Sequence, residues 1–436
     1  MVPRIVLTVA VRQESTGQQG TLRDLVKANR AKLRRAFMSK EVPTMPQASQ
    51  GERPGLQNLE WYRIMRDNDP VWRDPKTGLW NVFRYEDVAV VLTDYRTFSS
   101  DFSQFFPEQA ELIEGNIVAT DPPYHHQLRH LVSQAFTPRA ITRLQARIGE
   151  LTEELLDQTG GRTHIELVED LAYPLPVTVI AELLGVPATD RSRFKTWADA
   201  LLAHSNADPT DKEAIEAAAV HLRKFHDYLR EHISQRRIEP RQDLLGGLVA
   251  AEIEGKRLSD QEIVGFATTL LLAGHITTTA LLGNTILCLD EHPQTQAALR
   301  ANPAAIPEAI EEVLRYRSPV VQTGRVTTTE VRLGEQVIAP QQMLMVQLHS
   351  ANHDHRRFEN PGEFLFDRDP NPHVGFGKGI HFCLGAPLAR LEAKIALGVL
   401  LRRFSQLRVD PEQPLEEYAD PGFNSMQRLH LLVEPV

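Results

Sequence analysis

The residue with the clearest chemical potential is Cys383, which lies in a glycine-rich segment directly before a predicted helix that begins near Pro387. Unpaired backbone N–H groups and the positive end of the dipole at a helix N-terminus favour a thiolate over a thiol. Glycines at 377, 379 and 385 let the backbone pass close to a flat cofactor and point N–H groups at the sulfur. Taken alone, a cysteine in such a loop is usually a small buried hydrophobe, and we interpret the other cysteine, Cys288, in that way.

Two pairs of polar residues are spaced so that each shares one helix face. His125 and Arg129 lie four residues apart, so both side chains can reach one anionic group together. Glu312 and Arg315 lie three residues apart within a predicted helix over 306–316. The alternative for His125 and Arg129 is a pair of solvated basic residues. The default interpretation of Glu312 and Arg315 is an exposed ion pair, which contributes only a few tenths of a kcal/mol.

Helical periodicity dominates the chain and predicts the elements that must hold these residues. Apolar residues recur at spacings of three and four over 142–156, 190–203, 212–235, 259–290 and 306–316. Short strands are predicted over 80–83 and 331–347, where apolar and polar residues alternate and Gly and Pro mark hairpins. No internal repeat or linker interrupts the chain after about Pro43, which favours one domain.

The longest predicted helix begins at Ser259, a good N-cap, and Glu262 follows three residues later as in a capping box. If the helix runs to about Asp290 it spans on the order of 48 Å, enough to wall one side of a central cavity. Glycines, an asparagine, His275 and several threonines interrupt its apolar run. We therefore expect it to be buried in protein and not in lipid.

Composition excludes several classes of protein. The 436 residues carry a formal net charge of −9, whereas a nucleic-acid binder needs a basic face. Two cysteines are too few for a disulfide framework, and they favour a reducing, cytoplasmic location. No uncharged apolar stretch opens the chain, so neither a membrane-spanning helix nor a secretory signal is predicted.

The first forty residues form a region apart, with nine Lys or Arg against two acids. Three interpretations remain open: a basic tail that is disordered or helical, a start codon placed too far upstream with Met38 as the true start, and an organelle-targeting peptide. The predicted division is a basic extension over residues 1–44 and a single domain over 45–436.

The pattern around Cys383 identifies a family. Phe-Gly-x-Gly-x-His-x-Cys-x-Gly, from Phe376 to Gly385, resembles the heme-binding loop of the soluble bacterial cytochromes P-450. The resemblance covers roughly residues 45–436. It implies a mainly α fold with a smaller β region (α+β) and heme b (iron protoporphyrin IX) buried between the long central helix and the cysteine loop. Cys383 would be the iron ligand, whose thiolate pushes electron density onto the metal, and Phe376, Gly377 and Gly385 would lie against the cofactor.

The same resemblance implies further roles. Ala273, Gly274 and Thr277 are similar to the oxygen-binding groove of the family: the glycine would make room beside the iron, and the threonine hydroxyl would help to deliver protons. Glu312 and Arg315 match the family's Glu-x-x-Arg, an ion pair behind the heme. The expected contacts to the heme propionates are His125, Arg129, Arg325 and His373.

Two departures from the family pattern stand out. Ile276 occupies the position before Thr277 where the family commonly has an acid, so protons must come through water, His275, another residue or a substrate hydroxyl. We expect oxidation to proceed with looser coupling of reducing equivalents than in an acid-bearing relative. Glu363 stands where many members carry Arg, and Arg368 is the candidate third partner of the Glu312–Arg315 pair.

By resemblance, the substrate pocket is mostly apolar and suits a medium-sized molecule such as a polyketide, macrolide, terpenoid or fatty-acid derivative. Its expected lining is Phe102, Phe105, Phe106, Leu112, Ile113, Phe266, Leu270, Ala273, Val320, Val321 and Phe423. Most of these residues could equally belong to the core.

The implied activity is insertion of one oxygen atom from O2 into such a substrate, by C–H hydroxylation or epoxidation in secondary metabolism. Electrons would come ultimately from NAD(P)H through a ferredoxin and its reductase, with Lys378 and residues near Arg390 on the face that attracts an acidic partner. The expected protein is a monomer that binds neither nucleic acid nor membrane. The rival interpretations are a peroxide-driven or non-oxidative heme-thiolate enzyme (peroxygenase or isomerase), which would explain Ile276, and a module that only recruits partners, which the retained Cys383 opposes.

Overall fold

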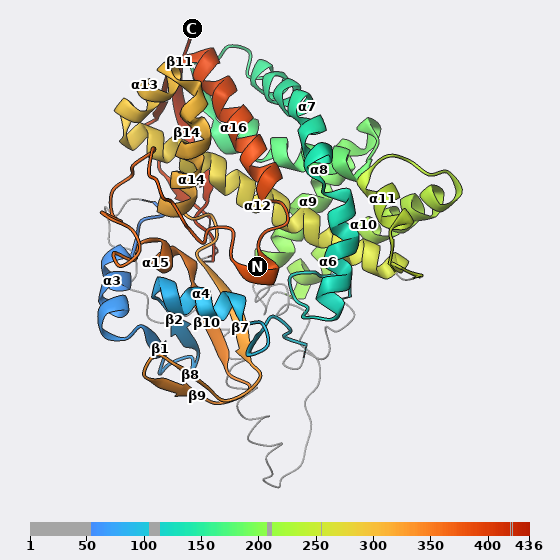
Figure 1. Cartoon of the computed structure of the whole chain (residues 1–436). Helices are drawn as coiled ribbons and strands as arrows, with labels where there is room; N and C mark the ends of the chain where they lie inside the picture. The colour runs from blue at the N-terminus through green and yellow to red at the C-terminus, as the bar shows by residue number, and fades with distance from the viewer. Residues whose placement is uncertain (1–53, 104–113, 207–211, 254, 419, 421) are drawn as a thin grey trace.

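The computed structural model describes residues 54–103, 114–206, 212–253, 255–418, 420 and 422–436. Helices α6 to α12 and α16 fill one side of the molecule, and a small sheet with α3, α4 and α15 against it forms the other (Figure 1). The structure confirms the predicted fold class, mainly α with a smaller β region. The predicted extension over residues 1–44 lies outside the described residues.

The long helices occur where the apolar periodicity predicts them. The segments 142–156, 190–203 and 212–235 fall within or almost within α7, α9 and α10, and 306–316 coincides with α14. The helices are α3 (Leu59–Asn68), α4 (Tyr85–Thr93), α6 (Tyr124–Ala135), α7 (Pro138–Asp157), α8 (Pro174–Leu184), α9 (Arg191–Asn206), α10 (Lys212–Ile238), α11 (Leu244–Ala250), α12 (Asp260–Glu291), α13 (Pro293–Ala301), α14 (Ile306–Tyr316), α15 (Leu348–Asn352) and α16 (Ala386–Arg403). Short 3-10 or π turns are η2 (Val168–Ala172), η3 (Ala188–Asp190), η4 (Pro303–Ala305) and η5 (Gly379–His381).

The main sheet has the strand order β1-β2-β10-β7-β3, in which β10 pairs parallel with β2 and antiparallel with β7. The predicted strand region 331–347 consists of three strands, because turns separate β8, β9 and β10 and the first two form a hairpin. A second sheet has the order β11-β14-β4. The strands are β1 (Val71–Arg73), β2 (Trp80–Val82), β3 (Phe98–Ser99), β4 (His164–Glu166), β5 (Glu252–Ile253), β6 (Lys256–Arg257), β7 (Gln322–Thr327), β8 (Val331–Leu333), β9 (Gln336–Ile338), β10 (Met343–Gln347), β11 (Phe404–Val409), β12 (Glu416–Glu417), β13 (Met426–Arg428) and β14 (His430–Pro435).

The central helix α12 begins with the predicted capping box. The backbone N–H of Glu262 donates to the Ser259 hydroxyl at 3.0 Å, and the Glu262 carboxylate accepts from the Ser259 N–H at 2.7 Å. Among the described residues, α12 is the one helix long and apolar enough to cross a membrane by length and composition. Its most apolar window is 61% buried and it packs against α8, α16 and α14, as expected of a core helix.

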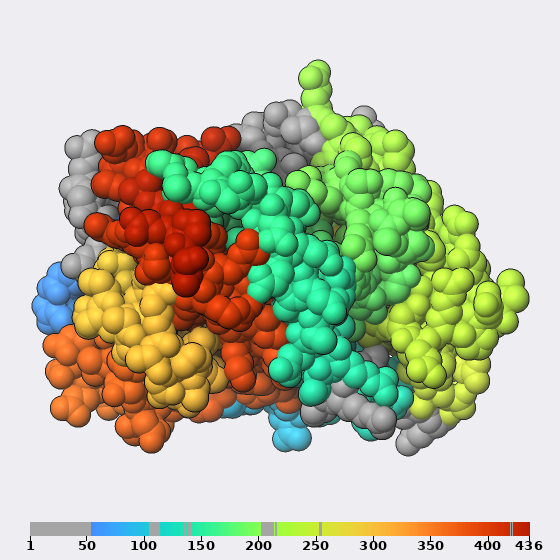
Figure 2. Space-filling model, turned by 90° about the horizontal axis from the view of Figure 1, so that it is seen from above, coloured from blue at the N-terminus to red at the C-terminus, as the bar shows by residue number. Residues whose placement is uncertain are grey.

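Helices that are far apart in the sequence pack against one another around α12 and α16. Helix α16 packs on α7, and α12 packs on both α8 and α16. In Figure 2 the segment that contains α6 and α7, drawn in teal, runs across the face between the red C-terminal segments and the green segments of α9 and α10. Arg129 Nη2 donates to the Phe382 carbonyl at 2.7 Å, which ties α6 to the loop before α16.

A buried ion network supports the loop that leads to Cys383. Arg315 forms a bidentate pair with Glu312 at 2.7 and 2.8 Å, and both side chains are fully buried. Arg368 Nε donates to both Glu312 oxygens at 3.1 Å, which confirms the predicted third partner. Arg315 also donates to the carbonyls of Asn352, Pro361 and Glu363. The network therefore ties α14 to the long irregular segment between α15 and η5.

Removing the cation at the centre of this network is expected to destabilise the fold strongly. The substitution Arg315→Met leaves Glu312 buried with only Arg368 as a charged partner, and breaking a buried pair in this way costs about 3–5 kcal/mol. Urea unfolding of the variant measures the loss.

The matched control is Arg63→Met, which removes an exposed pair with Glu60 and should lower the stability far less. Equal losses in the two variants would show that burial of the Arg315 pair carries no special energetic weight.

Candidate active site

A cavity of about 280 Å³ lies between α12 and the cysteine loop. Its wall combines a sulfur, two guanidinium groups and a largely apolar surface. The predicted site residues that line it are Arg129, Phe266, Leu270, Ala273, Gly274, Thr277, Val320, Arg325, Phe376, Gly377, Cys383, Gly385 and Phe423. Folding therefore brings together residues from α6, α12, β7, the cysteine loop and the C-terminal segment.

The cysteine loop adopts backbone conformations that glycine makes accessible. Gly377 and Gly379 have φ of 71° and 72°, in the left-handed region that side chains strain. A Cβ on Gly379 would also lie 2.7 Å from the Leu92 carbonyl oxygen at the end of α4. The Cys383 N–H donates to the Phe376 carbonyl at 2.9 Å, which closes the loop on itself. The loop geometry thus presents the sulfur to the cavity just before α16.

Burial, and not the helix terminus, dominates the acidity of this thiol. Burial raises the pKa of Cys383, against smaller lowering effects of the Gly385 backbone N–H, the Arg129 guanidinium and the Ala386 backbone N–H. The Gly385 and Ala386 backbone N–H groups at the start of α16 thus lower the pKa of Cys383, as expected of a helix N-terminus, but burial outweighs them. A bound cation is the agent that would hold the sulfur ionised.

The predicted oxygen-side residues of α12 lie on the cavity wall. The Thr277 hydroxyl donates to the Ala273 carbonyl at 2.8 Å, the i−4 bond usual for a threonine within a helix. Gly274 also faces the cavity, but a Cβ there would lie 2.6 Å from Ile180 Cδ1 of α8. The glycine therefore makes room for helix packing as well as for the cavity.

The two residues between Gly274 and Thr277 point away from the cavity. Ile276 is buried among apolar side chains of α12 and its neighbours. His275 is fully buried, its Nδ1 lies 2.5 Å from the Leu271 carbonyl oxygen, and its ring stands edge-on to Tyr173. His275 is not among the residues that line the cavity in the described part of the chain. The structure therefore gives it no place as a proton relay.

Cationic groups gather at one edge of the cavity. Arg325 is buried, and within the described part of the chain its side chain donates from Nη1 to the neighbouring Gly324 carbonyl at 2.6 Å. Burial lowers the pKa of Arg325 to about 10, an effect that Asp121 only partly offsets. Such a guanidinium is short of an anionic partner, and a carboxylate placed in the cavity would supply one.

Two of the predicted propionate contacts, His125 and His373, are not among the residues that line the cavity in the described part of the chain. His373 is not among the lining residues of the described chain, because its Nε2 lies 3.0 Å from Glu311 and its Nδ1 accepts from the Gly375 N–H at 3.1 Å. His125 is buried behind the wall, with its ring 4.3 Å from that of His381. His381 lines the cavity in their place. The sequence analysis missed it although it is the histidine of the Phe-Gly-x-Gly-x-His-x-Cys motif itself.

The apolar lining was predicted only in part. Phe102 and Val321 are buried but are not among the lining residues of the described chain. Phe102 packs over Gly324, where a Cβ would lie 2.9 Å from its ring, and Val321 bonds through its backbone to Gly422 and His349. Phe105, Phe106, Leu112 and Ile113 lie outside the described residues.

The polar groups around the cavity fit an iron porphyrin. Neither ring nitrogen of His125 has a hydrogen-bond partner, although both are buried. Within the described residues no three His, Cys, Asp or Glu side chains group as metal ligands, so the cavity offers one sulfur and no protein cage. A metal that brings its own macrocycle suits this donor set, and Arg129, Arg325 and His381 suit the carboxylates of that macrocycle.

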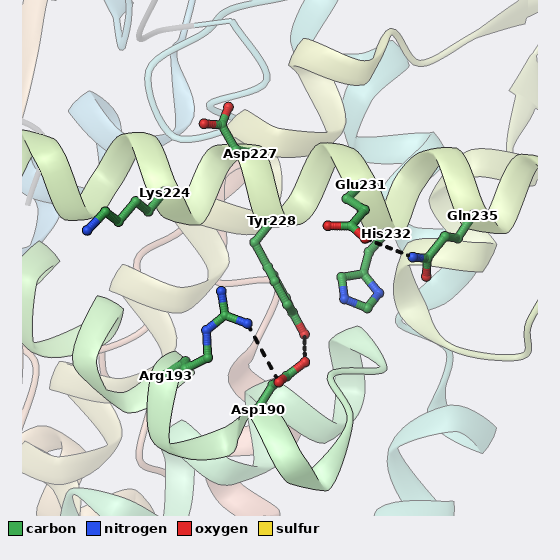
Figure 3. Close-up of a pocket in the computed structure, with 8 residues that line it drawn as sticks. All are labelled: Asp190, Arg193, Lys224, Asp227, Tyr228, Glu231, His232 and Gln235. Atoms are coloured by element: carbon green, nitrogen blue, oxygen red, sulfur yellow. Dashed lines mark hydrogen bonds and ion pairs between the residues drawn. The ribbon is translucent and has the colours of Figure 1, made fainter.

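A second hollow, of about 470 Å³, lies between α10 and the junction of η3 and α9 (Figure 3). Tyr228 donates to Asp190 at 3.0 Å, and Arg193 lies 3.8 Å from the same carboxylate and over the Tyr228 ring. No residue of the cysteine loop lines this hollow, so we do not place the chemistry there. Its lining residues are Asp190, Arg193, Lys224, Asp227, Tyr228, Glu231, His232 and Gln235.

Comparisons with known proteins agree with this site. The family model for cytochrome P-450 matches residues 57–431. Cyclomarin C epoxidase of Salinispora arenicola is 42% identical, over 85% of this chain and 94% of that protein, and erythromycin C-12 hydroxylase of Saccharopolyspora erythraea is 44% identical, over 82% and 91%. The ligand-free structure of the P-450 TbtJ1 is 45% identical, covers 89% of this chain and all of the other, and superposes with a TM-score of 0.82.

A second solved structure, HmtT of himastatin biosynthesis, is 46% identical and covers 85% of this chain and 96% of the other, with a TM-score of 0.80. The chain therefore belongs to the cytochrome P-450 family. It is a cytochrome P-450 monooxygenase, and membership in this family implies a heme cofactor.

Removing the buried guanidinium is expected to weaken heme retention. The substitution Arg325→Met takes away a desolvated cation, and truncating one partner of a buried charge pair costs about 2–5 kcal/mol of binding. Transfer of heme to an excess of an apo-globin acceptor measures the dissociation rate. Arg332→Met, which removes an exposed arginine on β8, serves as the control and should leave the rate unchanged. Equal dissociation rates in the two variants would contradict a role for Arg325 at the heme.

Acid is expected to destabilise the fold through its buried histidines. Burial lowers the pKa of His275 to about 4, so the folded protein keeps this ring neutral while the unfolded chain protonates it near pH 6.5. The unfolded state binds more protons in that range, and stability therefore falls as pH falls from 6.5 to 4, by up to about 3 kcal/mol for this group. His275→Gln should flatten the dependence of urea stability on pH, whereas the exposed His164→Gln should not. An unchanged slope in His275→Gln would refute the assignment.

Proposed function

We propose that this enzyme inserts one oxygen atom from O2 into a medium-sized apolar substrate, by C–H hydroxylation or epoxidation, in secondary metabolism. The observation that carries the proposal is one cavity with the Cys383 sulfur on one side and Thr277 with an apolar wall on the other. Relatives named as an epoxidase and a hydroxylase of natural products support both reaction types.

In this proposal Cys383 binds the iron of heme b, whose chemistry when bound is activation of O2 by two electrons. Arg129, Arg325 and His381 hold the propionates, and Phe376, Gly377 and Gly385 lie against the ring. His125 supports His381 from behind through their ring contact. Thr277 can accept a hydrogen bond from water while it donates to Ala273, so it orients water for proton delivery.

The wall opposite Cys383 selects for apolar surface. Phe266, Leu270, Val320 and Phe423 contribute to it, and they exclude water from the space where substrate would lie. Substrates that bury apolar area with few hydrogen bonds, such as polyketides, macrolides, terpenoids or fatty-acid derivatives, suit this lining. A cytochrome P-450 of Bacillus megaterium solved with corticosterone, 37% identical with a TM-score of 0.81, shows that a relative accommodates a rigid apolar ring system.

Electrons would reach the site from NAD(P)H through a ferredoxin and its reductase. On the cysteine side Lys378 is exposed, with its amino group over the Tyr85 ring, and can attract an acidic partner. Arg390 suits this role less well, because Glu311 binds it in a bidentate pair at 2.6 and 2.7 Å. We further propose that the protein is a cytoplasmic monomer with a single domain over residues 45–436.

A second candidate is a peroxide-driven heme-thiolate enzyme. The specific observation in its favour is Ile276, a buried apolar residue in place of the acid that commonly precedes Thr277. Turnover with hydrogen peroxide but not with a ferredoxin, its reductase and NADPH would favour this candidate over the monooxygenase.

The iron–sulfur bond is open to a direct spectroscopic test. Purified holoprotein, reduced and exposed to carbon monoxide, should show the red-shifted Soret band of a thiolate-bound heme. The substitution Cys383→Ala should abolish that band, because the described cavity lining contains no other cysteine. Cys288→Ala is the matched control and should keep the band, since Cys288 lies buried in the core. Persistence of the thiolate spectrum in Cys383→Ala would overturn the proposed function.

A further inference from the structure

A row of three side-chain amides crosses the main sheet beside the cavity. Asn81 of β2, Gln347 of β10 and Gln322 of β7 lie on adjacent strands. In the register of the sheet Gln347 lies opposite Gln322, and Asn81 lies opposite the residue two positions before Gln347. Side chains that are opposite one another, or two apart on one strand, leave the same face, so the three amides share one face of the sheet. We call these three side chains the amide row.

Hydrogen bonds fix which end of each amide faces the next. Asn81 Nδ2 donates to the Leu79 backbone carbonyl at 3.4 Å, and because that carbonyl can only accept, Asn81 Oδ1 is left to face Gln347. Gln347 Nε2 donates to Asn81 Oδ1 at 3.0 Å and to Gln322 Oε1 at 2.9 Å. Asn81 and Gln347 are buried, whereas Gln322 is half-buried and lines the cavity. Gln322 therefore uses its oxygen within the amide row and keeps its NH2 group for another partner.

The surroundings of this NH2 group are apolar. In the part of the chain that the structure describes, no group accepts a hydrogen bond from Gln322 Nε2. Val320, two residues earlier, lines the cavity next to Phe423, with which it forms an isolated β-bridge. A donor among apolar side chains is unfavourable until an acceptor meets it. A bound molecule that carries an oxygen would supply that acceptor.

The position of Gln322 on β7 directs its side chain away from that of the buried arginine. Gln322 and Arg325 lie three residues apart on the strand, so their side chains leave opposite faces. Gly324 shares the face of Gln322, and Phe102 packs over this glycine. The amide NH2 group therefore belongs to the apolar side of the strand and not to the side that we assign to the propionates.

The threonines of α12 that line the same cavity do not compete as donors. The hydroxyls of Thr269, Thr277 and Thr278 donate to the carbonyls four residues earlier at 2.9, 2.8 and 2.8 Å. Each hydroxyl hydrogen is thus engaged within the helix, and only the oxygen lone pairs face outward. An acceptor oxygen on a bound molecule finds its donor on β7 and not on these threonines.

We propose that Gln322 determines substrate specificity by donating a hydrogen bond to an oxygen of the substrate, so that the enzyme prefers an apolar skeleton with a ketone, lactone, ester or ether group over a plain hydrocarbon. The inference rests on the proposed monooxygenase function and narrows its substrate class. Oxygenated polyketides and macrolides can make this bond, whereas unoxygenated terpenes cannot. A fixed donor in an otherwise apolar wall also restricts how the molecule turns, and thereby which carbon is oxidised.

The test uses azoles, which bind the heme iron of the holoenzyme through their own nitrogen. Imidazoles with alkyl tails of graded length are made in matched pairs, with a ketone in one member and a C=CH2 group of the same shape in the other. The Soret shift gives the dissociation constant of each. At the length that fits, the ketone should be favoured about five- to tenfold more in the wild type than in Gln322→Met, the range of one net hydrogen bond. Comparison between variants cancels the different hydration of the two probes.

The variants are chosen so that each result decides the question. Gln322→Met and Gln322→Leu both remove the donor, and either one suffices if the other retains no heme. Gln336→Met, at an exposed position on β9, is the control and should match the wild type. If at no tail length the ketone preference falls in the Gln322 variants, the inference is overturned. Absence of the thiolate carbon monoxide spectrum in the wild type would instead defeat the proposed function, so the two failures are distinguishable.

Discussion

The rest of the structure depends on keeping polar groups in a space that excludes water. The cavity places a thiol, two guanidinium groups and a carboxyl among phenylalanine, leucine and valine side chains. Each of these polar groups would be more stable in water, and burial shifts the pKa of Cys383, Arg325 and Glu392 in the direction of the neutral form. The fold holds such groups out of water because surrounding elements enclose the cavity and bond to the loop that carries Cys383.

The ion network around Glu312 of α14 supports the segment that leads to Cys383. Glu312 accepts hydrogen bonds from Arg315, Arg368 and the side chain of Asn371, as well as from the backbone N–H of Leu365. The long segment before Cys383 has little regular secondary structure, so its backbone groups need such partners. An ion network centred on the fully buried Glu312–Arg315 pair meets this need, whereas an exposed pair at the same spacing would contribute little.

Helix α12 packs on a neighbouring helix with one side and lines the cavity with another, and both sides are largely apolar. One side packs on α8, where Gly274 admits Ile180, and the other lines the cavity with Ala273 and Thr277. Ile276 belongs to the packing side, where it joins an apolar cluster with residues of the neighbouring helices. A buried acid of the cavity wall, Glu392, lies instead on α16, the helix that begins just after Cys383.

The sequence by itself determined the elements and the chemistry of the loop. Apolar spacing predicted α7, α9, α10, α12 and α14, because an amphipathic helix buries one face. The glycines around Cys383 predicted a loop, and two of them, Gly377 and Gly379, adopt positive φ angles that other residues rarely adopt. Tertiary structure decided which polar side chains face the cavity. His373 bonds Glu311 from a distant helix and His381 takes the place at the wall, while Glu392 lies unpaired in a stretch that reads as an ordinary helix. Local spacing fixes a residue's face on its own element, but its neighbours across the fold decide whether that face meets a partner or an empty space.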